Sequence, residues 1–230
     1  MRKIAVLTGA GISQESGIPT FRGNDGLWEK YDLYDLATPE GFSKNPRLVW
    51  EWYIHRRNLI KSAKPNEAHK TLVKLENKLG DGFILITQNV DNLHRIAGSK
   101  NLIELHGNIF KVKCTNCKAE YFEFGDLKPM PECKECGGLL RPGVVWFGES
   151  LPIDALNRAI SYSESCDIFV CIGTSAVVYP AAELPVLAKQ RGATVIEINP
   201  ERTPVSDIAD IKIQDKASSG VKKLLEILGI

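Results

Sequence analysis

The sequence lacks the features that direct a protein to a membrane or to nucleic acid. No segment approaches the roughly 18 consecutive apolar residues that a membrane-spanning helix needs. Runs of like charge are absent, and 29 basic against 28 acidic residues leave a net charge of only +1. The chain therefore has no general attraction for nucleic acid or an anionic membrane. Because 43% of its 230 residues are hydrophobic, a disordered chain is excluded as well.

The first residues of the chain share only a basic start and a short apolar run with a signal peptide. Met1-Arg2-Lys3 precedes the short apolar run Ile4–Thr8, but no small-residue cleavage site follows and Gly9 comes at once. We interpret this run as a first buried strand, and we expect an intracellular, cytoplasmic protein.

Cysteine is scarce, and four of the six cysteines form one spaced motif. Cys114, Cys117, Cys133 and Cys136 read C-x2-C-x15-C-x2-C, which is typical of a tetrahedral zinc site. Two disulfides are the alternative, which a reducing compartment disfavours. Since four thiolates complete the ligand set, the motif predicts one structural Zn2+ ion. Cys166 and Cys171 border an apolar run and are interpreted as small buried hydrophobic residues.

Short apolar runs recur along the chain and alternate with helical patterns. Because the runs are rich in Ile, Val and Leu without strict alternation, they predict strands covered on both faces. They are Ile4–Thr8, Phe83–Thr87, Leu102–Leu105, Ile168–Ile172, Thr194–Ile198 and Ile211–Ile213. Helices are predicted from the Asn66 cap to Leu79, from Ala181 to about Arg191, and from Val221 to Leu228. This order predicts an α/β fold, a Rossmann-like, doubly wound parallel sheet.

Two stretches interrupt the alternation and predict a smaller, second domain. Residues 110–145 hold the four cysteines and several turn residues, so we expect a zinc-ribbon module there. Residues 31–65 contain Pro39, Pro46 and a strong helical pattern, which indicates a helical module. The large domain is then discontinuous and comprises residues 1–30, 66–109 and 146–230.

A glycine turn, Gly9-Ala10-Gly11, directly follows the first strand. Glycines at this place let a backbone approach a pyrophosphate, although Gln14 stands where the usual dinucleotide fingerprint has a third glycine. A plain strand-to-helix turn is the alternative. The segment 13–22 is expected to be a loop, because Gly17, Pro19 and Gly23 oppose a long helix, and such a loop suits a lid over a cofactor.

Six blocks along the chain resemble the signature segments of the sirtuins, the NAD-dependent protein lysine deacylases. The blocks are Gly9–Ser13, Ser16–Arg22, Thr87–His94, Leu105–Gly107, Gly173–Ser175 and Ile198–Pro200. They stand in the family's order, and the four-cysteine module lies where the family has it. The resemblance implies a nucleotide-binding large domain, a small domain of zinc and helical modules, and NAD as co-substrate. It also implies an acylated lysine of a protein as substrate, with nicotinamide and O-acyl-ADP-ribose as products.

The resemblance also assigns residues to the cofactor. Several of them follow predicted strands, so they should meet at the carboxyl edge of the sheet. Capping of the next helix by Asn89 or Asp91 is a second role that the sequence leaves open. The expected cofactor-binding residues are Gly9, Ala10, Gly11, Ser13, Glu15, Pro19, Phe21, Arg22, Trp28, Gln88, Asn89, Asp91, Gly173, Thr174, Ser175, Asn199 and Ala217.

His106 is the expected general base. It follows a predicted strand and precedes Gly107, and an imidazole with a pKa of about 6.5 can take a ribose hydroxyl proton at neutral pH. Asn89 and Asp91 are expected beside it in the catalytic site. The segment carrying Val145, Phe147, Gly148 and Glu149 resembles the family's peptide-binding segment. A plain connector with buried aromatic residues is the alternative for that segment.

One helix carries an arginine on a mostly apolar stripe. The stripe of the helix predicted from Pro46 to Ile60 reads Val49, Tyr53, Arg56 and Ile60. The Tyr-x-x-Arg pair resembles the sirtuin branch that removes succinyl and malonyl groups, because guanidinium and phenol can together hold a carboxylate. The alternative is a surface arginine.

The predicted function is removal of succinyl, malonyl and acetyl groups from lysine with NAD. Alternatives within the fold are a deacetylase without acidic-acyl preference and a protein ADP-ribosyltransferase. A non-catalytic zinc ribbon that binds nucleic acid is disfavoured by the near-neutral charge, and neither direct nucleic-acid binding nor a membrane partner is expected. An NAD dehydrogenase is disfavoured by Gln14 and by the neutral Asn199 where a ribose-binding acid would stand.

Overall fold

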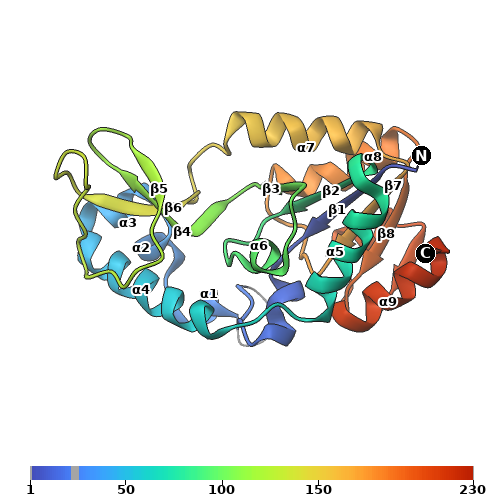
Figure 1. Ribbon diagram of the computed structural model, residues 1–230, viewed down its shortest axis with the longest axis horizontal. Helices are drawn as coiled ribbons and strands as arrows, with labels where there is room; N and C mark the ends of the chain where they lie inside the picture. Colours follow the sequence, from blue (N-terminus) through green and yellow to red (C-terminus); the bar gives the residue numbers. More distant parts are fainter. Residues whose placement is uncertain (1, 22–25, 230) are drawn as a thin grey trace.

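A computed structural model describes residues 2–21 and 26–229 of the chain. Its large sheet has six parallel strands in the order β3-β2-β1-β7-β8-β9 (Figure 1). The strands are β1 (Ile4–Thr8), β2 (Phe83–Thr87), β3 (Leu102–Glu104), β7 (Ile168–Ile172), β8 (Thr194–Ile198) and β9 (Ile211–Ile213). The predicted doubly wound parallel sheet is confirmed, and only β3 ends one residue earlier than expected.

Helices cover both faces of this sheet. On one face, α5 (Glu67–Leu79) and α9 (Ala217–Leu228) bury apolar side chains against alternate residues of the strands. On the other face, α7 (Ile153–Ser165) and α8 (Leu184–Gln190) pack against the remaining strand residues. Since every residue of the central strands is buried between the two layers, their apolar runs show no alternation.

The predicted ends of α5 are those observed. The Asn66 side chain accepts hydrogen bonds from the first turn of the helix, and Gly80 follows its last residue. By contrast, α9 begins at Ala217, four residues before the predicted start, and α7 was not predicted at all.

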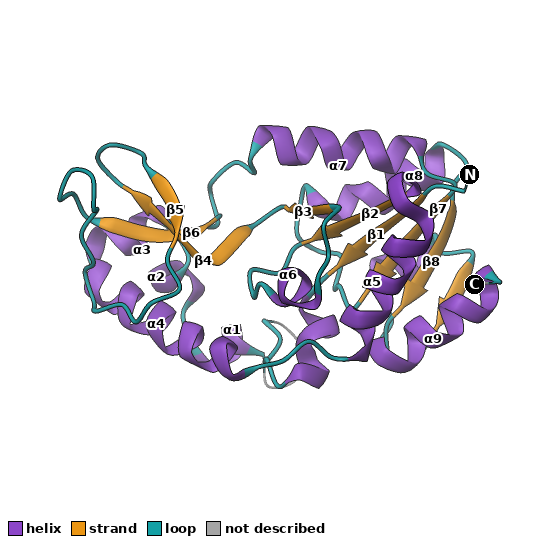
Figure 2. Cartoon of the chain, viewed as in Figure 1, coloured by secondary structure: helices purple, strands orange, loops and turns teal. Residues whose placement is uncertain are grey.

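A smaller domain forms the other end of the molecule (Figure 2). It contains an antiparallel sheet in the order β5-β4-β6, made of β4 (Gly107–Cys114), β5 (Glu120–Phe122) and β6 (Leu140–Val144). The helices α2 (Leu33–Leu36), α3 (Pro39–Lys44) and α4 (Pro46–Ser62) share its apolar core, and the short helix α1 (Leu27–Lys30) precedes them in the chain. A separate apolar core joins α4 to this sheet, and within it the Trp50 indole donates a hydrogen bond to the Leu140 carbonyl at 2.8 Å.

Short elements connect these strands and helices along the chain. The segment Ala10–Ser16, expected as part of a loop, is instead the 3-10 helix η1, which ends at Gly17 with a φ of +84°. A 3-10 helix, whose hydrogen bonds join residues i and i+3, usually forms only short pieces, so the glycines and proline that oppose a long helix do not prevent it. The remaining short elements are η2 (Gly80–Gly82), α6 (Leu93–Ala97), η3 (Ala181–Glu183) and η4 (Pro204–Asp207).

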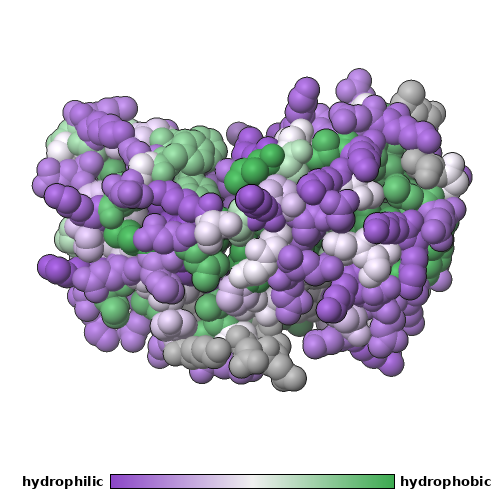
Figure 3. Space-filling model, turned by 60° about the horizontal axis from the view of Figure 1, so that its bottom comes forward, coloured by the Kyte–Doolittle hydropathy of each residue, from purple (hydrophilic) through white to green (hydrophobic). Residues whose placement is uncertain are grey.

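In the described part of the chain, no helix combines the length and apolar character needed to cross a membrane. Hydrophilic residues cover most of the face drawn in Figure 3, with hydrophobic residues between them in small groups. Cys166 and Cys171 are buried in the apolar layer of α7 and α8, as predicted.

Candidate active site

A cavity of about 890 Å³ lies at the carboxyl edge of the large sheet and reaches the small domain. Turns that follow β1, β2, β3, β7 and β8 line one side of it, and α4 with the segment after β6 lines the other. The sequence-predicted residues at its wall are Gly9, Ala10, Gly11, Glu15, Phe21, Tyr53, Arg56, Gln88, Asn89, His106, Val145, Phe147, Gly148, Glu149, Gly173, Thr174, Ser175, Asn199 and Ala217. The chain thus brings most of the predicted site into one concave space.

The glycine turn after β1 packs directly on the turn after β7. A Cβ added to Gly9 or to Gly11 would lie 2.7 Å from atoms of Gly173 or Thr174. The Gly11 amide donates to the Gly173 carbonyl at 2.8 Å. These glycines are therefore required by a close backbone contact between two turns, and both of them line the cavity.

Polar side chains tie three of the strand ends together. The Gln88 amide after β2 donates to the Thr174 hydroxyl after β7 at 2.8 Å. The Asn199 amide after β8 donates to the Thr174 carbonyl oxygen at 3.0 Å. The wall on this side is therefore held in one geometry before any ligand binds.

Asn89, Asp91 and Ser13 form a buried group beside the main cavity. They line a hollow of about 10 Å³, the size of one water molecule, together with Pro19 and Arg56. Ser13 donates to one Asp91 oxygen at 2.6 Å, and the Asn89 amide donates to the Gly9 carbonyl at 3.0 Å. Burial raises the pKa of Asp91, against the opposing effects of Ser13, the Leu93 amide and Arg56.

Asp91 lies one residue before Asn92, the N-cap of α6, but its side chain still holds the start of that helix. Its second oxygen accepts from the Leu93 amide at 2.9 Å, at the start of α6. Asn89 bonds to the turn after β1 instead of capping a helix. Asp91 therefore fixes the start of α6, whereas Asn89 fixes the turn after β1.

His106 lies between β3 and β4, where the chain passes from the large domain to the small one. Its Nδ1 atom is 3.0 Å from the Gln88 carbonyl oxygen, which can only accept. The neutral ring therefore carries its proton on Nδ1, and Nε2 is the nitrogen with a lone pair for an incoming proton.

The turn that carries His106 is pinned on several sides. The Val145 amide donates to the His106 carbonyl at 2.9 Å. Asn108, which is fully buried, donates to the Glu104 carboxylate at 2.7 Å across the turn. Gly107 has a φ of +78°, and a Cβ there would overlap the Gly143 carbonyl oxygen on β6. The position of the imidazole is therefore fixed by backbone and side chain together.

Arg56 is a buried cation at the wall of the cavity. Its side chain is 6% exposed and packs between the rings of Phe21 and Trp52, at 4.7 and 5.1 Å from their centroids. Within residues 2–21 and 26–229, it forms no hydrogen bond and no ion pair. Burial lowers its pKa to about 10, so the guanidinium remains charged at neutral pH. The alternative of a surface arginine is wrong.

Two neighbours of Arg56 on α4 differ from it in their partners. Tyr53 is buried, and its hydroxyl accepts a hydrogen bond from the Trp146 indole at 2.9 Å. Burial raises the pKa of Tyr53 to about 12, so its hydroxyl keeps its proton. Arg57 is buried as well, but it donates to the main-chain carbonyls of Ile109 and Glu123. Arg57 therefore joins α4 to the small sheet, whereas Arg56 faces the cavity.

The segment after β6 is held by an ion pair. Arg141 binds Glu149 through both carboxylate oxygens, at 2.5 and 2.9 Å. The Phe147 amide donates to the Ala37 carbonyl at 2.9 Å. The aromatic residues Trp146 and Phe147 of this segment line the cavity.

Two expected cofactor residues fall outside what the structure describes. Arg22 belongs to residues 22–25, which are not described. Trp28 lies in α1, but its side chain is not among those described. Glu15 is described, and its carboxylate accepts from the Ser218 amide in the first turn of α9 at 2.9 Å.

The sequence analysis did not identify two loops and one tryptophan that line the cavity. Val177, Val178 and Tyr179 come from the loop after β7, and residues 201–204 come from the loop after β8. Trp52, beside Arg56, was not singled out either. Both loops follow strands whose carboxyl ends were placed at this edge, and that was the signal available for them.

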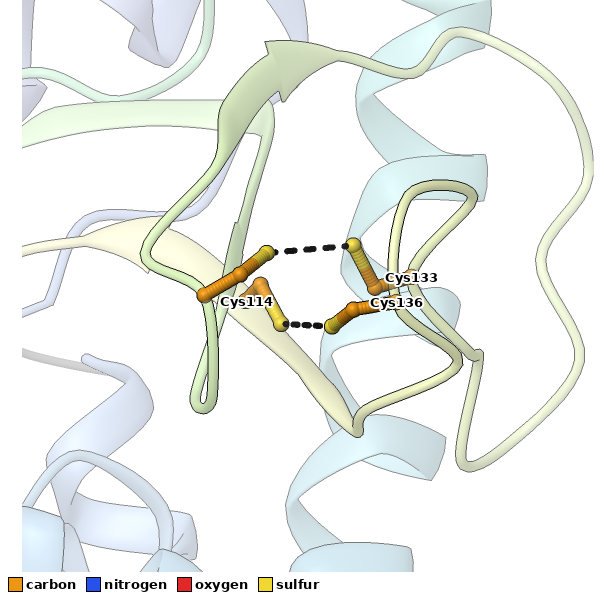
Figure 4. A group of neighbouring side chains, drawn as sticks. Cys114, Cys133 and Cys136 are labelled. Carbon is orange, nitrogen blue, oxygen red and sulfur yellow. Dashed lines mark hydrogen bonds between the residues drawn. The ribbon is translucent and has the colours of Figure 1, made fainter.

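The four cysteines of the small domain form one cluster. Their sulfur atoms all lie within 4.8 Å of one another, and the closest pairs are Cys114–Cys136 at 3.5 Å and Cys117–Cys133 at 3.7 Å. Figure 4 shows the labelled side chains of Cys114, at the end of β4, and of Cys133 and Cys136, in the loop before β6, pointing toward one another. The separations are far too long for disulfides and match the roughly 3.8 Å edge of a zinc–thiolate tetrahedron. The cluster is positioned to bind a zinc ion.

Known proteins resemble this chain over nearly its whole length. The model of the Sir2 family matches residues 9–180. The NAD-dependent protein deacylase of Aquifex aeolicus is 60% identical over 227 residues, covering 98% of this chain and 95% of that protein. A crystal structure of a Sir2 homologue with NAD superposes with a TM-score of 0.92 at 50% identity, covering 99% of this chain and 89% of the other. A complex of Sir2 with a p53 peptide and NAD+ gives a TM-score of 0.88 at 38% identity, covering 99% and 94%.

Proposed function

The chain belongs to the Sir2 family and is an NAD-dependent protein deacylase, and we propose that it acts preferentially on lysine side chains carrying succinyl or malonyl groups. The observation that carries this preference is the buried guanidinium of Arg56. A cation with 6% exposure loses most of its hydration, and among the described residues only two aromatic rings and the nearby charge of Asp91 offset that loss, without a hydrogen bond or an ion pair. A carboxylate at the end of the acyl group supplies an ion-pair partner.

The residues at the sheet edge fit NAD. The turn after β1 offers exposed backbone to a pyrophosphate, and Asn199 and Gln88 offer amides to ribose hydroxyls. When bound, NAD supplies the ribose carbon that gives up nicotinamide and receives the acyl oxygen. Glu15 and Ala217 form the end of the site at the start of α9. The cavity is also large enough for a dinucleotide and an extended side chain together.

His106 is the general base in this proposal. Its Nε2 atom has the lone pair, because the proton is held on Nδ1 by the Gln88 carbonyl. The base takes a proton from a ribose hydroxyl, and the Gln88 carbonyl stabilises the imidazolium that results. Asp91 holds the wall beside the small hollow through Ser13, and Asn89 also lines the main cavity, where its side chain can contact the cofactor.

The protein substrate enters as an extended segment. Val145, Phe147, Gly148 and Glu149 line the cavity in a stretch that follows a strand, and the Val177–Tyr179 loop lines it as well. Main-chain hydrogen bonds to such a segment depend little on side chains, so sequence preference around the lysine is loose. An intracellular, reducing setting belongs to the proposal, because the zinc cluster needs four thiolates.

A panel of acyl-lysine peptides tests the proposal. Identical peptides carrying succinyl, malonyl, acetyl or butyryl groups are incubated with NAD, and products are quantified by mass spectrometry. We expect the acidic acyl groups to have the higher kcat/KM. Equal or higher values for acetyl and butyryl peptides would instead identify a deacetylase without acidic-acyl preference.

A further inference from the structure

The hydrogen bond between Trp146 and Tyr53 has a fixed direction. The indole nitrogen of Trp146 lies 2.9 Å from the phenolic oxygen of Tyr53. An indole N–H can only donate, so the phenol must be the acceptor in this bond. The single proton of the phenol is then left for a different acceptor. Because Tyr53 and Arg56 both line the cavity and lie three residues apart on α4, that proton and the guanidinium can serve one ligand.

Trp146 is held in place by groups from the small domain. The Arg141 guanidinium lies 3.6 Å from the centroid of the indole ring and is itself bound to both oxygens of Glu149. One of those oxygens accepts from the Trp146 amide at 2.8 Å. Phe42 packs on the ring with a centroid distance of 5.2 Å. Ring and main chain of Trp146 are therefore both fixed, and so is the direction of its N–H.

We propose that Trp146 is a positioning residue that sets acyl specificity, by holding the Tyr53 phenol as a hydrogen-bond donor toward the acyl terminus. The inference rests on the proposed function. A terminal carboxylate accepts from both Arg56 and Tyr53. An acetyl group has no terminal acceptor and leaves the aligned phenol without a bond, which penalises that substrate. The indole thus adds to the discrimination without touching the reacting atoms.

The substitution Trp146→Phe removes the N–H and keeps an aromatic ring beside Arg141. We expect KM for a succinyl peptide to rise about three- to tenfold with a smaller change in kcat, the size of one lost neutral hydrogen bond. The ratio of succinyl to acetyl kcat/KM should fall by the same factor. Tyr53→Phe should lower that ratio as well, and the double variant should lie no lower than Tyr53→Phe alone.

Trp50→Phe is the matched control. Trp50 is also a buried indole of the small domain, but its N–H donates to the Leu140 carbonyl and not to the pocket. The same substitution there should leave the succinyl-to-acetyl ratio unchanged. A general loss of packing would instead lower kcat/KM for both the succinyl and the acetyl peptide, and it would do so in both variants.

The outcomes separate this inference from the function on which it rests. If wild type prefers succinyl peptides and Trp146→Phe keeps that ratio, the positioning role is overturned and the proposed function stands. If wild type shows no preference, both are overturned. Should Trp146→Phe not fold, nitrogen–proton NMR of Tyr53→Phe decides, because one of the four indole signals must shift when the bond is lost. Four unmoved signals would overturn the inference.

Discussion

The Nδ1 atom of His106 lies 3.0 Å from the main-chain carbonyl oxygen of Gln88. The segment after β2 therefore determines which nitrogen of the His106 ring, located after β3, carries the proton. The contact uses no second side chain. The tautomer is therefore fixed by the fold itself, and substitutions in neighbouring side chains leave Nε2 as the basic nitrogen.

Replacing that imidazole should stop turnover and leave the fold intact. We expect His106→Ala to lower kcat at least about 100-fold, the usual contribution of a general base. NAD should still stabilise the variant against heat, because the sheet-edge residues remain. His55→Ala, at an exposed position on α4, is the control and should keep wild-type rates of nicotinamide release. Turnover of His106→Ala within tenfold of wild type would remove His106 from the role of base.

Removing the buried cation should change substrate preference more than overall activity. In Arg56→Met, the succinyl-to-acetyl ratio of kcat/KM should fall about ten- to a hundredfold, as expected for one charge-assisted pair. Arg47→Met is the matched control, since Arg47 lies on the same helix and pairs with Glu51 at the surface. Peptide kinetics with both substrates measure the effect. An unchanged ratio in Arg56→Met would mean that the acyl carboxylate binds elsewhere.

The cysteine cluster should hold one zinc ion per chain. Elemental analysis of the purified protein should give a ratio near one, and Cys136→Ser should lower both the zinc content and the thermal midpoint. Cys166→Ala removes a buried thiol outside the cluster and should retain the metal. Zinc at full occupancy in Cys136→Ser would contradict the assignment.

Acid should destabilise the fold through a buried histidine pair. His69 and His94 are 0% and 2% exposed, and their ring centroids are 4.8 Å apart. Burial lowers the pKa of His69 to about 4 and holds that of His94 well below its usual value. The unfolded chain, with histidine pKa values of about 6.5, binds protons that the folded chain does not. Stability from this pair is thus complete above about pH 6.5 and is lost as the pH falls toward 4.

Urea unfolding with zinc in excess measures this effect. Between pH 7 and pH 5, the free energy of unfolding should fall by up to about 1.4 kcal/mol per pH unit for each histidine. His69→Gln should lower that slope, whereas His55→Gln, at an exposed site, should not. An identical slope in wild type and His69→Gln would show that other groups cause the acid sensitivity.

The sequence predicted the large domain better than the details around it. Strands buried on both faces produce short apolar runs, and five of the six have the predicted bounds. The ends of α5 were predictable because Asn66 and Gly80 are strong capping residues. No comparable signal marks α7, which begins after Pro152 without a side-chain cap and buries only Ala159 and Ser163 fully. Its largely polar surface hid the helix.

The parts of the candidate site that depend on a local sequence motif were predictable. The parts that depend on contacts between distant residues were not. Residues at strand ends and the cysteine motif carry recognisable spacing. The burial of Arg56 between Phe21 and Trp52 depends on a loop and a helix that are distant in sequence. The direction of the Trp146–Tyr53 hydrogen bond likewise joins residues 93 positions apart. Such contacts follow from tertiary packing alone.

The meeting of Gly107 with Gly143 has an evolutionary consequence. Side chains are excluded at 107 by Gly143 and at 143 by Lys111, so drift at this crossing is blocked on both strands. The opposite wall of the cavity, on α4, is built from the side chains of Trp52, Tyr53 and Arg56. Substitutions on α4 can therefore reshape that wall of the cavity, whereas the turn beside His106 has no room for an added Cβ.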